Sequence, residues 1–160
     1  MSESIISYTY NFYSDIKSVY EVIEKEQLKF FQQYKTNIEK LEKGLSIEKK
    51  LYTKTGQKPV KVKMKISEII KNEKIGLSTL YNEGSILQTY DLSMEDGITT
   101  VVYSEDNQFE KKHYILNYKI VSLFYRFFYK RKIKKRMEYI EMIINNKEYS
   151  YEVNNDDRSN

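Results

Sequence analysis

Residues 60–67 read VKVKMKIS, and this short stretch decides how the rest of the chain is interpreted. Its apolar side chains, Val60, Val62, Met64 and Ile66, alternate with three lysines and a serine. Alternation with a period of two is typical of a strand with one buried and one solvent-exposed face. We therefore predict a strand here whose apolar face is covered by another part of the chain.

Similar alternating runs lie on both sides of this stretch. Residues 75–81, 86–92 and 98–105 follow it, and they are separated by turn sequences such as Asn-Glu-Gly and Asp-Gly. Residues 6–12 and 45–51 precede it with the same period. Short turns between successive runs predict a meandering antiparallel sheet of about six strands.

A helical pattern separates the first two predicted strands. Ser14 or Asp15 can cap a helix, and apolar residues follow at helical spacing over residues 16–23. An apolar stripe continues over residues 27–43, and Gly44 is a natural stop for it. The sequence leaves open whether these residues form one bent helix or two.

The C-terminal part of the chain is also helical in pattern. Ile133, Met137, Ile140 and Ile144 are spaced four, three and four residues apart, which places them on one side of a helix. Residues 120–129 are apolar nearly all round, so we expect them to be covered on several sides. The pattern predicts one long C-terminal helix with a buried stripe.

Composition limits the possible classes of protein. The 160 residues suit one domain, and 40% of them are hydrophobic, so the chain can bury a core. No cysteine is present, which excludes disulfides and thiolate chemistry. A net charge of +4 is too small to indicate nucleic-acid binding. Because neither a signal peptide nor an apolar stretch of spanning length is visible, we expect a cytoplasmic protein.

Together the elements predict an α+β fold. A curved antiparallel sheet of about six strands would grip a long C-terminal helix, with one or two helices after the first strand. Three stretches carry a family resemblance: ISEIIKNEKI at 66–75, QTYDL at 88–92 and VVYSE at 101–105. They resemble the bacterial family known as domain of unknown function 3284, in the START-like (SRPBCC) helix-grip superfamily. Ser104 departs from the Tyr-Glu-Glu ending usual in that family.

The resemblance implies a START-like domain over residues 1–150, and we expect residues 151–160 to form a flexible tail. It also implies a cytoplasmic protein of Gram-positive bacteria, in a family sometimes associated with sugar-uptake genes. It supplies no catalytic residues.

Motifs for catalysis are absent from the sequence. There is no glycine-rich phosphate loop and no Gly-x-Ser-x-Gly elbow. His113 is the single histidine and lies in a polar stretch, where we expect it to be solvated. The acidic residues between Glu68 and Asp106, Glu105 among them, lie mostly at strand ends and turns, where we also expect them to be solvated. We therefore predict no catalytic residue, no cofactor and no metal site.

Two regions remain as candidates for binding. The first is a cavity between the sheet and the C-terminal helix, for which the candidate lining residues are Met64, Tyr81, Tyr90, Tyr103, Phe124 and Phe128. Tyrosine hydroxyls there could orient the polar end of an apolar or amphipathic ligand. A core filled by its own side chains is the alternative, and the sequence does not decide between them.

The second candidate is a basic surface on the C-terminal helix, made of Lys130, Arg131, Lys132, Lys134, Lys135 and Arg136. Such a surface could contact an anionic membrane or an acidic partner. The alternative is the solvated outer face of a helix whose apolar stripe packs in the core. Our first hypothesis is a non-enzymatic ligand-binding module, and our second is an interaction protein that uses this basic surface.

Overall fold

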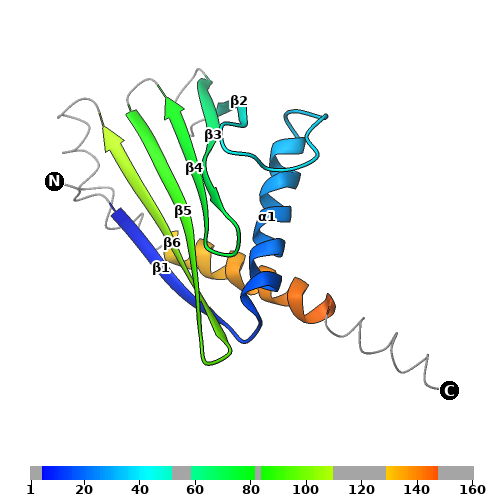
Figure 1. The fold of residues 1–160 in the computed structure, drawn as a ribbon. Coiled ribbons are helices and arrows are strands. Elements are labelled where there is room, and N and C mark those ends of the chain that lie inside the picture. The colour runs from blue at the N-terminus through cyan, green and yellow to red at the C-terminus, as the bar shows by residue number, and fades with distance from the viewer. Residues whose placement is uncertain (1–4, 52–58, 82–83, 110–128, 148–160) are drawn as a thin grey trace.

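A computed structural model of the chain describes residues 5–51, 59–81, 84–109 and 129–147. Figure 1 shows one sheet with two helices packed beside it. In chain order the elements are β1 (Ile5–Phe12), α1 (Ile16–Gln32), β2 (Ser46–Leu51), β3 (Val60–Ile70), β4 (Lys74–Tyr81), β5 (Gly84–Glu95) and β6 (Ile98–Phe109). A C-terminal helix follows at residues 129–147. The predicted α+β architecture is confirmed.

All six strands pair antiparallel, in the order β1-β6-β5-β4-β3-β2. The first strand of the chain therefore pairs with the last one and forms one edge of the sheet. Asp96 and Gly97 both have positive φ at the tight turn between β5 and β6. An Asp-Gly pair supplies that conformation at low cost, because glycine has no Cβ to clash.

The two faces of the sheet follow the alternation in the sequence. On the inner face, Ile75 of β4 lies opposite Tyr90 of β5, and Tyr90 lies opposite Tyr103 of β6. All three are buried. The residues next to these along each strand face outward. Asp91, which follows Tyr90, forms an ion pair of 3.3 Å with Lys74 on the outer face. The period of two thus decides which side chains reach the interior.

The sheet bends at one irregular position. The register between β3 and β4 shifts between Ile66 and Glu68, so Ser67 has no partner of its own. Gly76 lies opposite this bulge, and a Cβ there would come within 2.7 Å of the Ser67 Oγ. A bulge bends a strand and increases its twist, and a glycine opposite gives the crowded strand room.

Helix α1 begins as predicted at Asp15. The Asp15 carboxylate accepts hydrogen bonds from the Ser18 amide at 2.9 Å and the Ser18 hydroxyl at 2.6 Å. These bonds hold the pKa of Asp15 below its ordinary value. One side of the helix is buried, including Val19, Ile23 and Phe31.

The predicted continuation of the helical stripe to residue 43 is wrong, because α1 ends at Gln32 and the next residues form turns. Ile38 and Leu41 are nevertheless buried, so their apolar side chains pack into the core although they belong to a loop. The Gln32 side-chain amide donates to the Ile38 carbonyl at 2.8 Å, which satisfies a loop acceptor. Thr36 and Asn37 favour such turns over a helix interior, since their side chains compete for backbone hydrogen bonds.

The C-terminal helix buries the predicted stripe. Ile133, Met137, Ile140 and Ile144 are all buried, whereas Met142 on the same helix is 51% exposed. Tyr10 of β1 donates a hydrogen bond of 2.6 Å to Glu141, which fixes the helix to the edge of the inner face. In the part of the chain that the structure describes, no helix is both long enough and apolar enough to cross a membrane.

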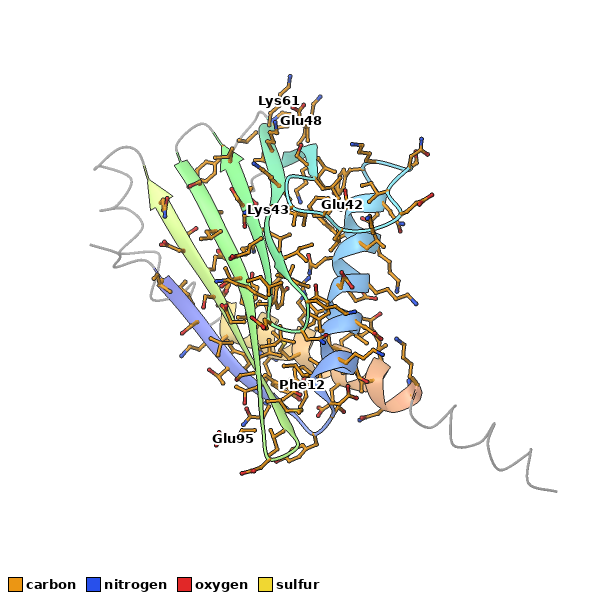
Figure 2. The ribbon with its side chains drawn as sticks, viewed as in Figure 1. Phe12, Glu42, Lys43, Glu48, Lys61 and Glu95 are labelled. Atoms are coloured by element: carbon orange, nitrogen blue, oxygen red, sulfur yellow. The ribbon has the colours of Figure 1, made fainter. Side chains whose placement is uncertain are left out.

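Both helices cover the same face of the sheet. Gln27 of α1 and Arg136 of the C-terminal helix each contact Tyr90, which lies on the inner face. Figure 2 shows that side chains fill the region between the sheet and the helices, with Phe12 near the turn that leads from β1 into α1. The core therefore lies between the sheet and the pair of helices.

Candidate functional site

The predicted cavity residues fall into three groups. Tyr90 and Tyr103 lie side by side at the centre of the inner face, with ring centroids 4.8 Å apart. Met64 is buried in the core. Tyr81 instead lines a groove at the far end of the sheet, and Phe124 and Phe128 lie outside the described residues.

Gln88, Tyr103 and Glu105 form a hydrogen-bonded polar cluster beside the two tyrosine rings. Gln88 donates to the Tyr103 hydroxyl at 2.7 Å and to the Glu105 carboxylate at 3.3 Å, and the Tyr103 hydroxyl is 3.5 Å from the same carboxylate oxygen. Glu105 is only 5% exposed. Burial raises the pKa of Tyr103, so its hydroxyl keeps its proton and can donate. Hydrogen bonds offset the cost of burying these groups and fix the orientation of the ring.

The expectation that Glu105 is solvated is therefore wrong. It lies two residues after Tyr103 and four after Val101, so the strand period places all three on the inner face. The sequence held this signal, because Glu105 continues an alternating run.

Tyr90 contacts one residue from each of the two helices. Its hydroxyl accepts a hydrogen bond of 3.4 Å from buried Gln27, and the Arg136 guanidinium lies 5.6 Å from its ring centroid. Burial raises the pKa of Tyr90, while Arg136 and the Gln27 hydrogen bond act in the opposite direction. The tyrosine is thus a neutral, hydrogen-bonded group with a cation over its ring.

A groove of about 330 Å³ opens at this point between α1 and the C-terminal helix. Its apolar lining comes from Ile23, Phe30 and Ile140, and Gln27 lies at its buried side. Arg136 and Tyr139 line the side formed by the C-terminal helix. Glu26, Lys29 and Gln33 complete the lining. The groove therefore combines apolar walls with a few polar groups, which is the usual composition of a small-molecule site.

Two cations lie at Phe30 or line this groove with it, namely Lys49 and Arg136, and Lys132 precedes Arg136 on the same helix. The Lys49 ammonium lies 4.8 Å from the Phe30 ring centroid and 5.7 Å from that of Tyr34. Burial, and then the charge of Lys132, lower the pKa of Lys49. Arg136 is one helical turn after Lys132 and lines the groove with Phe30. Neither Lys49 nor Lys132 has an ion-pair partner among the described residues.

The remaining predicted basic surface is exposed on the C-terminal helix. Lys130, Arg131, Lys134 and Lys135 all reach solvent, and Lys134 forms an ion pair of 3.8 Å with Glu138. Exposed pairs of this kind contribute little to stability. The helix therefore has a wet basic side opposite its buried apolar stripe.

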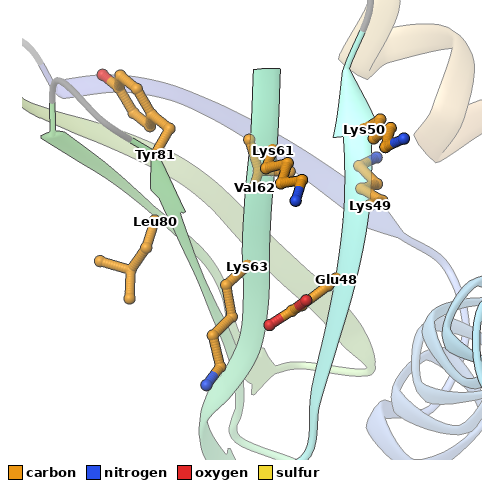
Figure 3. A pocket seen from close by; sticks show the side chains of 8 residues that line it. All are labelled: Glu48, Lys49, Lys50, Lys61, Val62, Lys63, Leu80 and Tyr81. Atoms are coloured by element: carbon orange, nitrogen blue, oxygen red, sulfur yellow. The ribbon is translucent and has the colours of Figure 1, made fainter. Parts of the chain in front are cut away.

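A second, larger groove of about 560 Å³ lies across β2, β3 and β4. Figure 3 shows that its side chains come from three neighbouring strands: Glu48, Lys49, Lys50, Lys61, Val62, Lys63, Leu80 and Tyr81. Lys50 lies opposite Lys61, and Glu48 lies opposite Lys63. Strand β2 is an edge of the sheet, and lysines on such a strand discourage pairing with another chain. We therefore interpret the lysines of this groove as a protection of the sheet edge against pairing with another chain, and not as a ligand site.

Among the described residues, no side chains have the arrangement that a metal site requires. No three His, Cys, Asp or Glu side chains among those residues lie close enough together to hold a metal ion. His113 lies outside the described residues. The sequence did not single out Gln27 or Lys49, because one lies in a helix and the other in a strand with no motif around it. Only the packing of α1 against the sheet brings Gln27 to the groove and brings Lys49 to Phe30, a residue that lines it.

Comparisons with known proteins bear on the fold. No family model matches the chain, and no curated protein matches it. Among solved structures, protein Ms6760 from Mycobacterium smegmatis has a TM-score of 0.55 at 9% identity, covering 89% of this chain and 92% of that one. An uncharacterised Rhizobium leguminosarum protein has a TM-score of 0.54 at 12% identity, covering 89% and 95%.

The protein Ara h 8.0201 has a TM-score of 0.50 at 11% identity, covering 89% of this chain and 97% of that one. At such identities the likeness establishes a shared fold alone. The chain thus has the helix-grip fold that the sequence predicted. No comparison supports the narrower resemblance to the domain of unknown function 3284.

Proposed function

We propose that this protein is a non-enzymatic module that binds a small amphipathic molecule beside the C-terminal helix, in the groove that this helix forms with α1. The observation that carries the proposal is the groove of about 330 Å³ between α1 and that helix. It lies at the lower end of the size range of small-molecule sites, which favours a short ligand over a bulky one.

The groove offers the two kinds of contact that such a ligand needs. Ile23, Phe30 and Ile140 would cover its apolar body. Gln27, whose side-chain amide donates to the Tyr90 hydroxyl, could turn that amide toward a polar group of the ligand. The cluster of Gln88, Tyr103 and Glu105 supports this arrangement from behind, because it holds the Tyr103 ring against that of Tyr90.

The test is the thermal stability of the full chain in a series of 1-alkanols from hexanol to decanol. A ligand that binds only the folded state raises its stability in proportion to affinity. If the chain of the alcohol is buried, each added methylene contributes about 0.8 kcal/mol, or about fourfold in affinity. An absence of stabilisation by every alcohol, or stabilisation that does not depend on chain length, would contradict the proposal.

Two matched variants locate the site. Gln33 and Lys35 are both exposed and both follow α1, but only Gln33 lines the groove. Gln33→Trp should fill the groove mouth and abolish the stabilisation by decanol, whereas Lys35→Trp should leave it intact. Equal behaviour of the two variants would place the alcohol elsewhere.

A second candidate function is electrostatic contact of the basic surface with an acidic partner protein. It is favoured by the exposed Lys130, Arg131 and Lys135, which have no ion pair among the described residues. Burial of the helix in a membrane surface would need an apolar face, and the apolar stripe of residues 129–147 already packs in the core. Binding of this kind should weaken steeply with salt and should be lost in a Lys130→Glu/Lys135→Glu variant.

A further inference from the structure

The position of Lys49 suggests what the polar end of the ligand is. Its ammonium lies 4.8 Å from the ring centroid of Phe30, and Phe30 is also a wall of the groove between the helices. Lys132 is close enough to Lys49 for its charge to lower the pKa of that amine. Lys49 therefore lies beside an apolar wall of the groove and within the electrostatic influence of Lys132, and neither lysine has a carboxylate partner among the described residues.

Arg136 adds a positive charge to the lining of the groove itself. It follows Lys132 by one helical turn, lines the groove, and lies 5.6 Å from the Tyr90 ring centroid. The groove also contains Glu26 and Lys29, but these two pair with each other at 2.7 Å and so nearly cancel. The mouth of the groove is left with an excess of positive charge.

Like charges that lie close together without counterions raise the energy of the folded protein. An anion bound among them lowers it, and a partly desolvated site strengthens that attraction. We propose that the ligand is an anionic amphiphile, whose single negatively charged head is held by Lys49, Lys132 and Arg136 while its apolar chain occupies the groove. This inference rests on the proposed function and narrows its ligand class.

The experiment compares three probes with the same chain length on the full-length protein: decanoate and decyltrimethylammonium below their micelle concentrations, and 1-decanol below its solubility limit. Isothermal titration calorimetry at low salt should find decanoate at least tenfold tighter than decanol, and the cation weaker than both. The advantage of decanoate should shrink as salt is raised. Binding of decanol with no preference for decanoate would overturn this inference and leave the proposed function standing. Failure of all three probes would remove both.

A pair of charge-matched variants tests the residues. Lys49→Gln/Lys132→Gln should remove most of the preference for decanoate over decanol. The control, Lys65→Gln/Lys135→Gln, changes the net charge equally at exposed positions away from the groove. An equal loss in both variants would mean that overall charge, and not this site, attracts the anion. Neutralising Lys49 and Lys132 also relieves their repulsion, so the first variant should remain folded.

The anionic head could belong to a free molecule or to a membrane lipid. Vesicles of phosphatidylglycerol in phosphatidylcholine form a separate arm of the same experiment. Binding to free decanoate but not to vesicles identifies a monomeric ligand. Vesicle binding that survives Lys49→Gln/Lys132→Gln but is lost in Lys65→Gln/Lys135→Gln would assign the anion to the outer surface and contradict the proposed site.

Discussion

Substitution of Met137 by alanine tests whether the C-terminal helix is truly gripped by the sheet. Met137 is fully buried, and it belongs to the same core as Tyr90, Tyr103 and Ile140. Met142 lies five residues later on the same helix and is 51% exposed. The two methionines therefore allow an identical change of side chain at a buried and at an exposed position.

The expected magnitude follows from the burial. A fully buried methionine replaced by alanine typically costs about 2–5 kcal/mol, because transfer energy is lost and a cavity remains. We expect about 3 kcal/mol for Met137→Ala, since the surrounding side chains come from two helices and a sheet and cannot all move inward. In a chain of this length that corresponds to a decrease of roughly 6–12 °C in Tm. Met142→Ala should change stability by less than about 0.5 kcal/mol.

Urea unfolding followed by circular dichroism measures both variants. A large loss for Met137→Ala with almost none for Met142→Ala is the expected result. Losses of similar size, or a negligible loss at Met137, would mean that the helix is not packed against the sheet. The groove between α1 and that helix would then lose its basis.

Three further changes test local parts of the fold. Asp15→Ala should cost about 1 kcal/mol near neutral pH through loss of the helix cap to Ser18. Because the folded pKa of Asp15 is lowered, its contribution exists above the unfolded pKa of about 3.9 and disappears as pH falls through the folded value, so urea midpoints of variant and wild type should converge in acid. Tyr10→Phe should cost about 1–2 kcal/mol in the same assay, since it removes the hydrogen bond to Glu141. Gly97→Ala should cost about 1 kcal/mol in thermal unfolding, because φ at Gly97 is +79° and alanine is strained there even though space is open.

The sheet could be predicted from the sequence because its signal is local. Alternation over residues 60–67 placed Val62, Met64 and Ile66 on the buried face, and the structure buries all three. The bulge at Ser67 could not be predicted in the same way. It depends on the opposite strand, where Gly76 leaves room for the Ser67 side chain.

The candidate site was harder to predict because it depends on long-range contacts. Tyr90 and Tyr103 were found by their strand period, but Gln27 reaches Tyr90 only because α1 lies across the sheet, 63 residues away in the chain. Lys49 shares the strand face of buried Ile47 in the alternating run 45–51, but only the position of α1 places Phe30 beside its ammonium. The end of α1 at Gln32 was missed because Ile38 and Leu41 continue an apolar stripe that a loop can also bury.

The most direct test of the account is a titration of the isotope-labelled protein with decanoate, followed by ¹H–¹⁵N correlation spectra. If the groove between α1 and the C-terminal helix receives the ligand, the largest shifts should fall on Gln27, Phe30 and Arg136, with smaller shifts on Tyr90, whose hydroxyl bonds to Gln27. Outer-face residues such as Ser78 and Lys63 should change little. Largest shifts on the outer face, or no shifts at any concentration below micelle formation, would contradict it.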